Sequence, residues 1–370
     1  MSRVYWIKGR SKDFRKSITS RVATILGLDE MAEVVVPNRS LAIKVNVSEL
    51  GYGYSLAPVV VNSFFEQTRD RGASSLVTDS GSLFKGPRFS GQDWTDTAIM
   101  QGHGIGDALD NQMMMAGGFT HEEGRFCISE GEHLGGVELG SLILDVTNLI
   151  VVSHVTAHPL AGLAGAVHNL GTGLLTRSGK ARVHSCLELQ FDANRCEGAK
   201  VCLAYCPTGA LSEAGSKVSF DPRMCNGCLG CFMTCPGGAM SIRPGTIPVF
   251  QESVAEAAVV VAKNLRGKAF YVNFLNSITP QSDDYPFSDI PFIPDLGVLA
   301  SDDPVALDWV TYQMIVRSPG IPGSIAEDLK VLEKGADKLE AITGTTPAHM
   351  LEYGEKMMLG RKDCEFLISG

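Results

Sequence analysis

Two cysteine runs carry the residue types and spacing in this chain that could do chemistry. The second run places Cys225, Cys228, Cys231 and Cys235 in the pattern C-x2-C-x2-C-x3-C-P. Three thiolates within seven residues can hold three corners of a cubic iron–sulfur cluster, and this spacing is typical of bacterial proteins with such clusters. Pro236 ends the loop, because its ring fixes φ and cannot extend a helix begun before it. The run therefore predicts a [4Fe–4S] cluster.

The first run repeats the second with one ligand missing. The differences 225 − 196, 231 − 202 and 235 − 206 are each 29, so Cys196, Cys202 and Cys206 have counterparts in the second run. The counterpart of Cys228 is Ala199, since 228 − 199 is also 29. A methyl group cannot bind iron, and the first run therefore lacks one ligand.

The fourth cysteine of each run ligates the other cluster in two-cluster ferredoxins. Applied to this chain, that exchange predicts a four-cysteine set of Cys206, Cys225, Cys228 and Cys231. It also predicts a three-cysteine set of Cys196, Cys202 and Cys235. We expect one [4Fe–4S] cluster, and a second cluster that is either [3Fe–4S] or a [4Fe–4S] cluster with one iron open to ligand. Cys186, ten residues before Cys196, is a candidate fourth ligand, and a decayed, merely structural cluster is the alternative.

Zinc is the main competing interpretation of the cysteines, because C-x2-C pairs also build four-ligand zinc sites. Seven cysteines do not divide into fours, and a doubled Cys-Pro pair is not a feature of zinc ribbons. A disulfide framework would need an oxidising compartment. The spacing therefore favours clusters over both alternatives.

A stretch rich in glycine and histidine precedes the cysteine runs and contains the other candidate site residues. His154 and His158 follow an apolar strand, and His168 and His184 lie between that strand and the first run. Open α/β sheets bind ligands at the carboxyl ends of their strands, so these histidines could line a cleft there, although each alone could be a satisfied structural residue. Metal binding by the first two, four residues apart, is a further alternative.

Charged residues complete the list of candidates. Lys180 and Arg182 could bind an anionic substrate near the clusters or face water, and Asp283 could act as an acid–base group or lie in a solvated turn.

Composition limits the class of protein. The chain has 370 residues and a net charge of −9, which argues against nucleic-acid binding because phosphates need a basic face. Its longest apolar runs are too short to cross a bilayer, and the basic N-terminus has no apolar region of a signal peptide. A chain with many cysteines, no membrane-spanning run and no signal peptide is predicted to lie in the reducing cytoplasm.

The elements that must position these residues alternate between strands and helices. Strands are expected at 4–7, 41–45, 75–78, 148–154, 269–274 and 295–300, and helices at 12–28, 58–71, 95–115 and 253–265. Strand, helix and strand at this spacing form a βαβ unit, which predicts an α/β fold with a mostly parallel sheet and helices on both faces. A two-cluster ferredoxin-like α+β module at 191–243 would interrupt it, between α/β segments at 1–190 and 244–370.

Several stretches together resemble the ferredoxin-fused domain of unknown function "three-six-two" family, which is found widely in anaerobes. They are Val167–Gly171, the two cysteine runs, Tyr271–Pro280 and Ile293–Asp308, and the resemblance covers about 41–315. The resemblance implies cluster binding and an α/β scaffold. Two departures stand out: Ala199 replaces a cluster cysteine, and Ser282-Asp-Asp284 replaces the Cys-Asp-Cys of many relatives.

Together these features predict an iron–sulfur protein that passes electrons between an external donor and a small molecule in the α/β cleft. The donor would be a redox partner such as a ferredoxin or flavoprotein, and the protein would then be an iron–sulfur oxidoreductase. One alternative is a non-catalytic electron carrier or redox subunit. The other is a non-redox lyase or sulfur-transfer enzyme that uses the open cluster as a Lewis acid.

Overall fold

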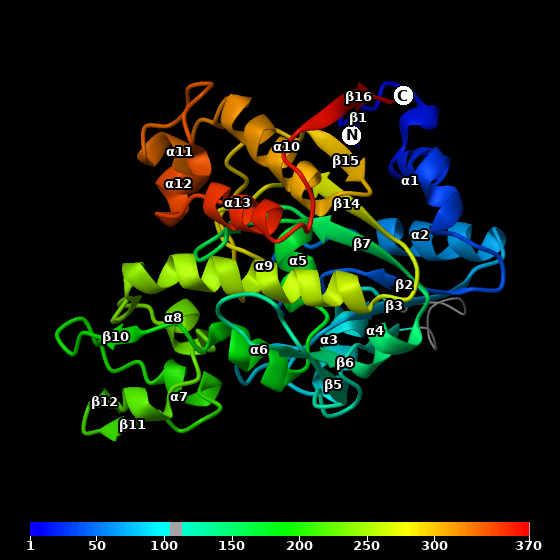
Figure 1. Cartoon of the computed structure of the whole chain (residues 1–370). Coiled ribbons are helices and arrows are strands. Elements are labelled where there is room, and N and C mark those ends of the chain that lie inside the picture. Colours follow the sequence, from blue (N-terminus) through cyan, green and yellow to red (C-terminus); the bar gives the residue numbers. More distant parts are fainter. Residues whose placement is uncertain (104–112, 370) are drawn as a thin grey trace.

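The computed structural model describes residues 1–103 and 113–369, and its centre is a sheet of eight strands (Figure 1). The spatial order is β16-β1-β15-β14-β7-β2-β3-β4. The strand bounds are β1 Ser2–Lys8, β2 Ser40–Lys44, β3 Ser74–Asp79, β4 Met113–Met115, β7 Asn148–His154, β14 Ala269–Leu275, β15 Gly297–Ser301 and β16 Cys364–Ile368.

The sheet is largely parallel, as the sequence predicts. β14, β7, β2, β3 and β4 form a continuous parallel run, and β15 is antiparallel to both of its neighbours. All seven residues of β7 are buried. This is what an apolar strand at the centre of a sheet covered on both faces requires.

Helices cover both faces of the sheet. Alternate residues of β7 contribute to two separate cores: Leu149 and Val151 to one, Ile150 and Val152 to the other. The second core is covered by α1 Ile18–Leu26, α2 Pro58–Asp70 and α3 Gly91–Met100. The first core contains residues of α4 Ser141–Asp145, α5 Ala166–Thr172, α6 Arg177–His184, α9 Ile247–Asn264, α10 Pro304–Arg317, α11 Ile325–Asp328, α12 Lys338–Thr343 and α13 Ala348–Lys356.

Smaller elements complete the α/β part. Two further strand pairs, each antiparallel, are β5 Gly124–Cys127 with β6 Val137–Gly140, and β8 Thr156–His158 with β9 Gly162–Ala164. Short 3₁₀ turns occur at Phe14–Lys16, Asp29–Glu33 and Pro244–Thr246, and a further one, Pro222–Met224, lies in the segment with the cysteine runs.

The segment with the cysteine runs protrudes from the α/β part, with β11, β12 and α7 farthest from the central sheet (Figure 1). Its strands form two antiparallel pairs, β10 with β13 and β11 with β12. The bounds are β10 Leu189–Phe191, α7 Val201–Tyr205, β11 Leu211–Ala214, β12 Lys217–Phe220, α8 Gly230–Thr234 and β13 Met240–Ile242. The boundary predicted at 191 therefore falls inside β10, and both flanking segments contribute strands to the one central sheet.

The offset of 29 recurs in the backbone of this segment. α7 and α8 begin 29 residues apart (230 − 201 = 29), and so do β11 and β13 (240 − 211 = 29). Positive φ angles repeat at the same offset in Gly198 and Gly227, Lys200 and Leu229, and Gly209 and Gly238. Non-glycine residues rarely adopt positive φ, so the pair Lys200 and Leu229 marks the same loop made twice.

One expected helix is wrong in its extent. Instead of a helix over 95–115, α3 runs from Gly91 to Met100, and Met113–Met115 form the edge strand β4. Positions 104–112 of that expected helix lie outside the described residues. Within the part of the chain that the structure describes, no helix combines the length and apolar character that crossing a membrane requires.

Candidate functional site

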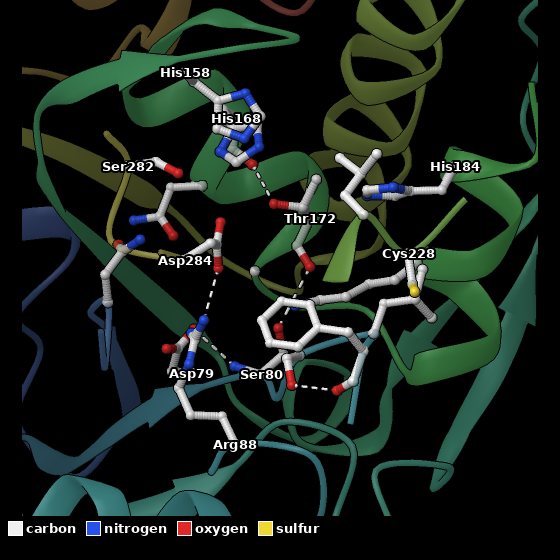
Figure 2. A pocket seen from close by; sticks show the side chains of 18 of the residues that line it. Asp79, Ser80, Arg88, His158, His168, Thr172, His184, Cys228, Ser282 and Asp284 are labelled. Atoms are coloured by element: carbon white, nitrogen blue, oxygen red, sulfur yellow. Dashed lines mark hydrogen bonds and ion pairs between the residues drawn. The ribbon is translucent and has the colours of Figure 1, made fainter. Parts of the chain in front are cut away.

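A polar pocket of about 80 Å³ lies at the carboxyl ends of β2 and β3 (Figure 2). Lys44 is the last residue of β2 and Asp79 the last residue of β3, and both line the pocket. Open α/β sheets commonly bind ligands at this edge, because the loops that leave parallel strands gather there.

A buried ion pair forms one wall of the pocket. Lys44 Nζ lies 2.7 Å from Asp79 Oδ1 and also donates to the Val45 carbonyl and to Asn169 Oδ1. Asp79 accepts from the Ser80 backbone N–H at 2.7 Å. Every charge of this pair is matched, so the pair positions the wall and offers no unsatisfied charge to a ligand.

A second buried cation, Arg88, holds the loop that contains the predicted Asp283. Its guanidinium lies 3.1 Å from Glu49 and 2.7 Å from Asp284. Burial opposes ionisation of Asp284, but Arg88 holds the pKa of that carboxyl well below its usual range. Asp284 therefore carries a negative charge into the pocket, and the candidate carboxylate is Asp284 and not Asp283, which does not line the pocket. Burial, followed by the charge of Asp284, raises the pKa of Asp283.

Two of the predicted histidines have neighbouring rings, inclined at 45°, at one end of the pocket. The rings of His158 and His168 have centroids 4.4 Å apart (Figure 2). His158 Nδ1 accepts the backbone N–H groups of Leu160 at 3.2 Å and Ala161 at 3.0 Å. Two donors on Nδ1 assign the proton to Nε2, and burial lowers the pKa of His158 to about 4. His158 is thus a neutral N–H donor.

Helix α6 supplies two more predicted residues, Lys180 and His184, which are four positions apart and share one face. Lys180 Nζ donates to the Gly81 carbonyl at 2.6 Å, and burial lowers its pKa to about 8. His184 Nδ1 lies 2.9 Å from the Gly227 carbonyl, which can only accept, so Nδ1 carries the proton. Burial lowers the pKa of His184 to about 4, which leaves Nε2 as an acceptor.

Asp308 positions the helix that carries His168 and Asn169. Its carboxylate accepts the backbone N–H groups of Ala166 and Val167, each at 2.8 Å, at the start of α5. Burial raises its pKa to about 6. A Cβ at Gly165 would lie 2.4 Å from the Asp308 carboxylate, so only glycine allows this approach. The His-Asn pair and the distant Asp308 therefore form one structural unit.

The pocket also touches the cysteine segment. Cys228, Leu229 and Met233 line it, and the hydrogen bond from His184 joins it to the loop at Gly227. Figure 2 shows the Cys228 side chain on the same side of the pocket as His184. One wall of the pocket is thus made by the second cysteine run.

The effects of the thiols on one another's pKa run mostly within the two predicted sets. Burial raises the pKa of Cys228 to about 12, and Cys206 and Cys225 add to the increase. Burial likewise raises the pKa of Cys231, with further increases from Cys228, Cys225, Cys206 and, more weakly, Cys202. In the other set, burial, Cys235 and Cys196 raise the pKa of Cys202. Among residues 1–103 and 113–369, no three His, Cys, Asp or Glu side chains converge closely enough to hold a single metal ion.

The three-cysteine set borders a separate, smaller cavity that the cysteine segment alone lines. Cys196, Cys202 and Cys235 line it together with Ala199, which is exposed. Cys186 does not line it: its thiol donates to the Val183 carbonyl and lies near Ser253 of α9. The suggested role of Cys186 as a fourth ligand therefore has no support from its position.

Two more candidates lie away from the pocket. His154 lines a different cavity beside Phe274, and its Nε2–H donates to the Asn276 carbonyl, 2.9 Å away. His154 is the last residue of β7 and His158 the last residue of β8, and the two side chains line different cavities. Arg182 is exposed, donates to the Leu134 carbonyl and lies over the Phe126 ring.

Several pocket residues were not among the predicted site residues. They are Lys44, Arg88, Asn169 and Asp284. A lysine at the end of an otherwise apolar strand was a usable signal for Lys44. Arg88 offered no such signal, because only the tertiary structure brings it to Glu49 and Asp284.

The fold and the pocket define an α/β protein with a ligand-sized cavity at the carboxyl edge of its parallel strands. A family model described as "Domain of unknown function (DUF362)" matches residues 41–313. That match covers most of the chain, and the protein belongs to this family.

Solved structures resemble the chain only distantly. One is the lactate racemase apoprotein from Thermoanaerobacterium thermosaccharolyticum, with 10% identity over 74% of this chain and 50% of that chain, and a TM-score of 0.38. Another is a protein from Thermotoga maritima, with 10% identity over 74% of this chain and 54% of that one, and a TM-score of 0.37. The chain thus spans about half the length of each. No curated protein matches its sequence.

Proposed function

We propose that this protein is an iron–sulfur oxidoreductase whose cysteine segment is a ferredoxin-like module inserted in the α/β fold. The four-cysteine set would hold a [4Fe–4S] cluster, and the three-cysteine set a [3Fe–4S] or open-site [4Fe–4S] cluster. Bound clusters would supply one-electron transfer between a ferredoxin or flavoprotein and a small molecule in the pocket. The observation that carries this proposal is the contact of Cys228 with the pocket.

The local geometry of the cysteines supports cluster binding. Iron ligands must be thiolates, and hydrogen bonds to the sulfur stabilise the charged form. The Gly227 N–H donates to Cys225 Sγ at 3.4 Å, and the Ala239 N–H donates to Cys235 Sγ at 3.2 Å. The repeated helices and repeated positive φ angles support two similar binding loops, as a doubled cluster module requires.

The positions of the two cysteine sets favour a path for electrons from the surface of the cysteine segment to the pocket. Cys228 and Cys231 are buried against the α/β part, whereas Ala199 is exposed at the far end of the segment. An external redox partner could therefore approach the three-cysteine set, while the four-cysteine set faces the pocket.

Pocket chemistry favours an enzyme over the alternative of a plain electron carrier. His158, His168, His184 and Lys180 line one cavity, where a carrier needs no such group of proton donors and acceptors. The Lewis-acid alternative needs an open iron in the pocket, but the cavity at Ala199 is lined only by the cysteine segment. No contact favours that alternative.

Iron and sulfide analysis with electron paramagnetic resonance on the anaerobically purified chain tests the proposal. We expect about seven or eight iron atoms per chain, in two sets of signals. Cys228→Ser should remove the four-cysteine signal alone. Cys364→Ser is the matched control, because Cys364 lies on edge strand β16, in neither set. A colourless protein that contains zinc and no iron would refute the proposal.

A further inference from the structure

Among the cations that line the pocket, Lys180 has no carboxylate within 4.0 Å in the described part of the chain. Lys44 is paired with Asp79, and Arg88 is paired with Glu49 and Asp284. The ion pairs within 4.0 Å among the described residues include none for Lys180, whose ammonium donates only to the Gly81 carbonyl. An ammonium has three N–H donors, so two of them remain for a ligand.

His158 adds a hydrogen-bond donor to the pocket that Lys180 lines. Its ring holds the proton on Nε2, because its Nδ1 is occupied by two backbone N–H groups. A neutral N–H donor together with an unpaired ammonium is an arrangement that suits an oxyanion, which accepts several hydrogen bonds at once. Asp284 adds a negative charge to the pocket, because Arg88 holds its carboxyl in the ionised form.

The size and polarity of the cavity limit the anion. A volume of about 80 Å³ admits several water-sized groups, and therefore a molecule of few heavy atoms. Asp284 repels a second negative charge on its side of the pocket, which disfavours a multiply charged phosphate. A monoanion with a flat pair of oxygens satisfies the charge and the space together.

We propose that the pocket binds a small monocarboxylate, whose carboxylate group lies on Lys180 with His158 as an additional donor. This assignment names the substrate class of the pocket and rests on the proposed function. The rest of the ligand would then extend toward His184 and Cys228, which share the wall of the pocket on the α6 side.

Calorimetric titration of the anaerobically purified full chain with acetate tests the assignment, with acetamide as the neutral probe of the same shape. We expect acetate to bind and acetamide to bind at least about tenfold more weakly, because a charge-assisted hydrogen bond is lost. Lys180→Met should weaken acetate binding by a similar factor. Lys180→Arg, which keeps the charge, should retain most of the binding, and thermal unfolding of each variant tests that it folds.

Arg182→Gln is the matched control, because Arg182 lies on the same helix but contacts Leu134 and Phe126. Its acetate affinity should stay within about twofold of the wild type. Equal binding of acetate by Lys180→Met, equal binding of acetamide, or binding of inorganic phosphate but not acetate would each overturn the assignment. Iron analysis of the same samples separates the two proposals: Lys180-dependent acetate binding by iron-free protein would refute the redox function and leave the carboxylate site intact.

Discussion

The two ends of the cysteine segment are built from the same repeat but lie in opposite environments. The end with Cys228 is buried against α6 and the pocket, and Gly227 accepts a hydrogen bond from His184. The end with Ala199 is exposed and borders a cavity made only by its own segment. Burial raises the pKa of Cys228 to about 12, whereas backbone N–H groups of Val218 and Gly198 lower the pKa of Cys196.

This difference suggests a division of labour between two copies of one loop. The buried copy has a cysteine, Cys228, at the position that lines the pocket. The exposed copy has Ala199 at the corresponding position, beside the cavity that the cysteine segment alone lines. If that interpretation is right, changes at the two ends should have unequal consequences.

Loss of a ligand should have its largest effect at the buried end. Cys228→Ser should remove about four iron atoms per chain and lower the thermal stability, because the cysteine also forms part of the pocket wall. Cys196→Ser should remove the iron of the exposed set and leave the four-cysteine signal unchanged. Iron analysis, electron paramagnetic resonance and thermal unfolding measure these effects. Equal loss of both signals in both variants would show that the ends are not independent.

The second-largest difference should be in the reactivity of the thiols at the two ends when the protein contains no cluster. After anaerobic removal of iron, iodoacetamide should alkylate Cys196 more than about tenfold faster than Cys228 at pH 7.5. The lowered pKa of Cys196 gives it more thiolate, and the raised pKa of Cys228 gives it less, so the ratio should fall as the pH rises toward 12. Mass spectrometry at successive times measures both rates. Similar rates would contradict the difference in burial.

A buried ion pair of the pocket wall and an exposed ion pair of the cysteine segment should also contribute unequally to the free energy of unfolding. Lys44→Met leaves Asp79 buried without its partner and should cost about 3–5 kcal/mol in the free energy of unfolding. Lys200→Met breaks the Lys200–Glu213 pair, whose side chains are 33% and 67% exposed, and should cost less than about 1 kcal/mol. Denaturant unfolding measures both. The double variant Lys44→Met/Asp79→Leu should recover part of the loss, because no buried charge remains unpaired.

Restoring the missing ligand should have the smallest effect. Ala199→Cys should add about one iron atom if the exposed cluster is [3Fe–4S], and none if it is already an open-site [4Fe–4S] cluster. In either case the four-cysteine signal and the affinity of the pocket for acetate should not change. A change in either would show that the exposed end affects the pocket, and would contradict the independence of the two ends.

Much of the fold follows from the sequence because its signals are local. The apolar run of β7 predicts a central strand, and the glycine and proline signals around α2 predict its bounds to within a residue or two. The extent of α3 was not predicted, because the pattern over 95–115 has no local signal for the strand that pairs with β3 at Met113–Met115. That strand forms because β3 offers it backbone hydrogen bonds at the edge of the sheet, a contact between segments far apart in sequence.

The sequence by itself predicts two similar cysteine loops, Ala199 in the place of a fourth cysteine and the grouping of seven thiols, since residue spacing is a property of a short stretch of chain. Only the tertiary structure decided which loop faces the pocket, because that depends on contacts between segments far apart in sequence. In the folded chain, His154 lines a different cavity from the other histidines. Asp284, and not Asp283, lines the pocket, and Arg88 is paired with Asp284. Within residues 1–103 and 113–369, the tertiary structure also pairs Lys44 and Arg88 with carboxylates and places none within 4.0 Å of Lys180, a balance of charge that exists only when the surrounding elements have packed.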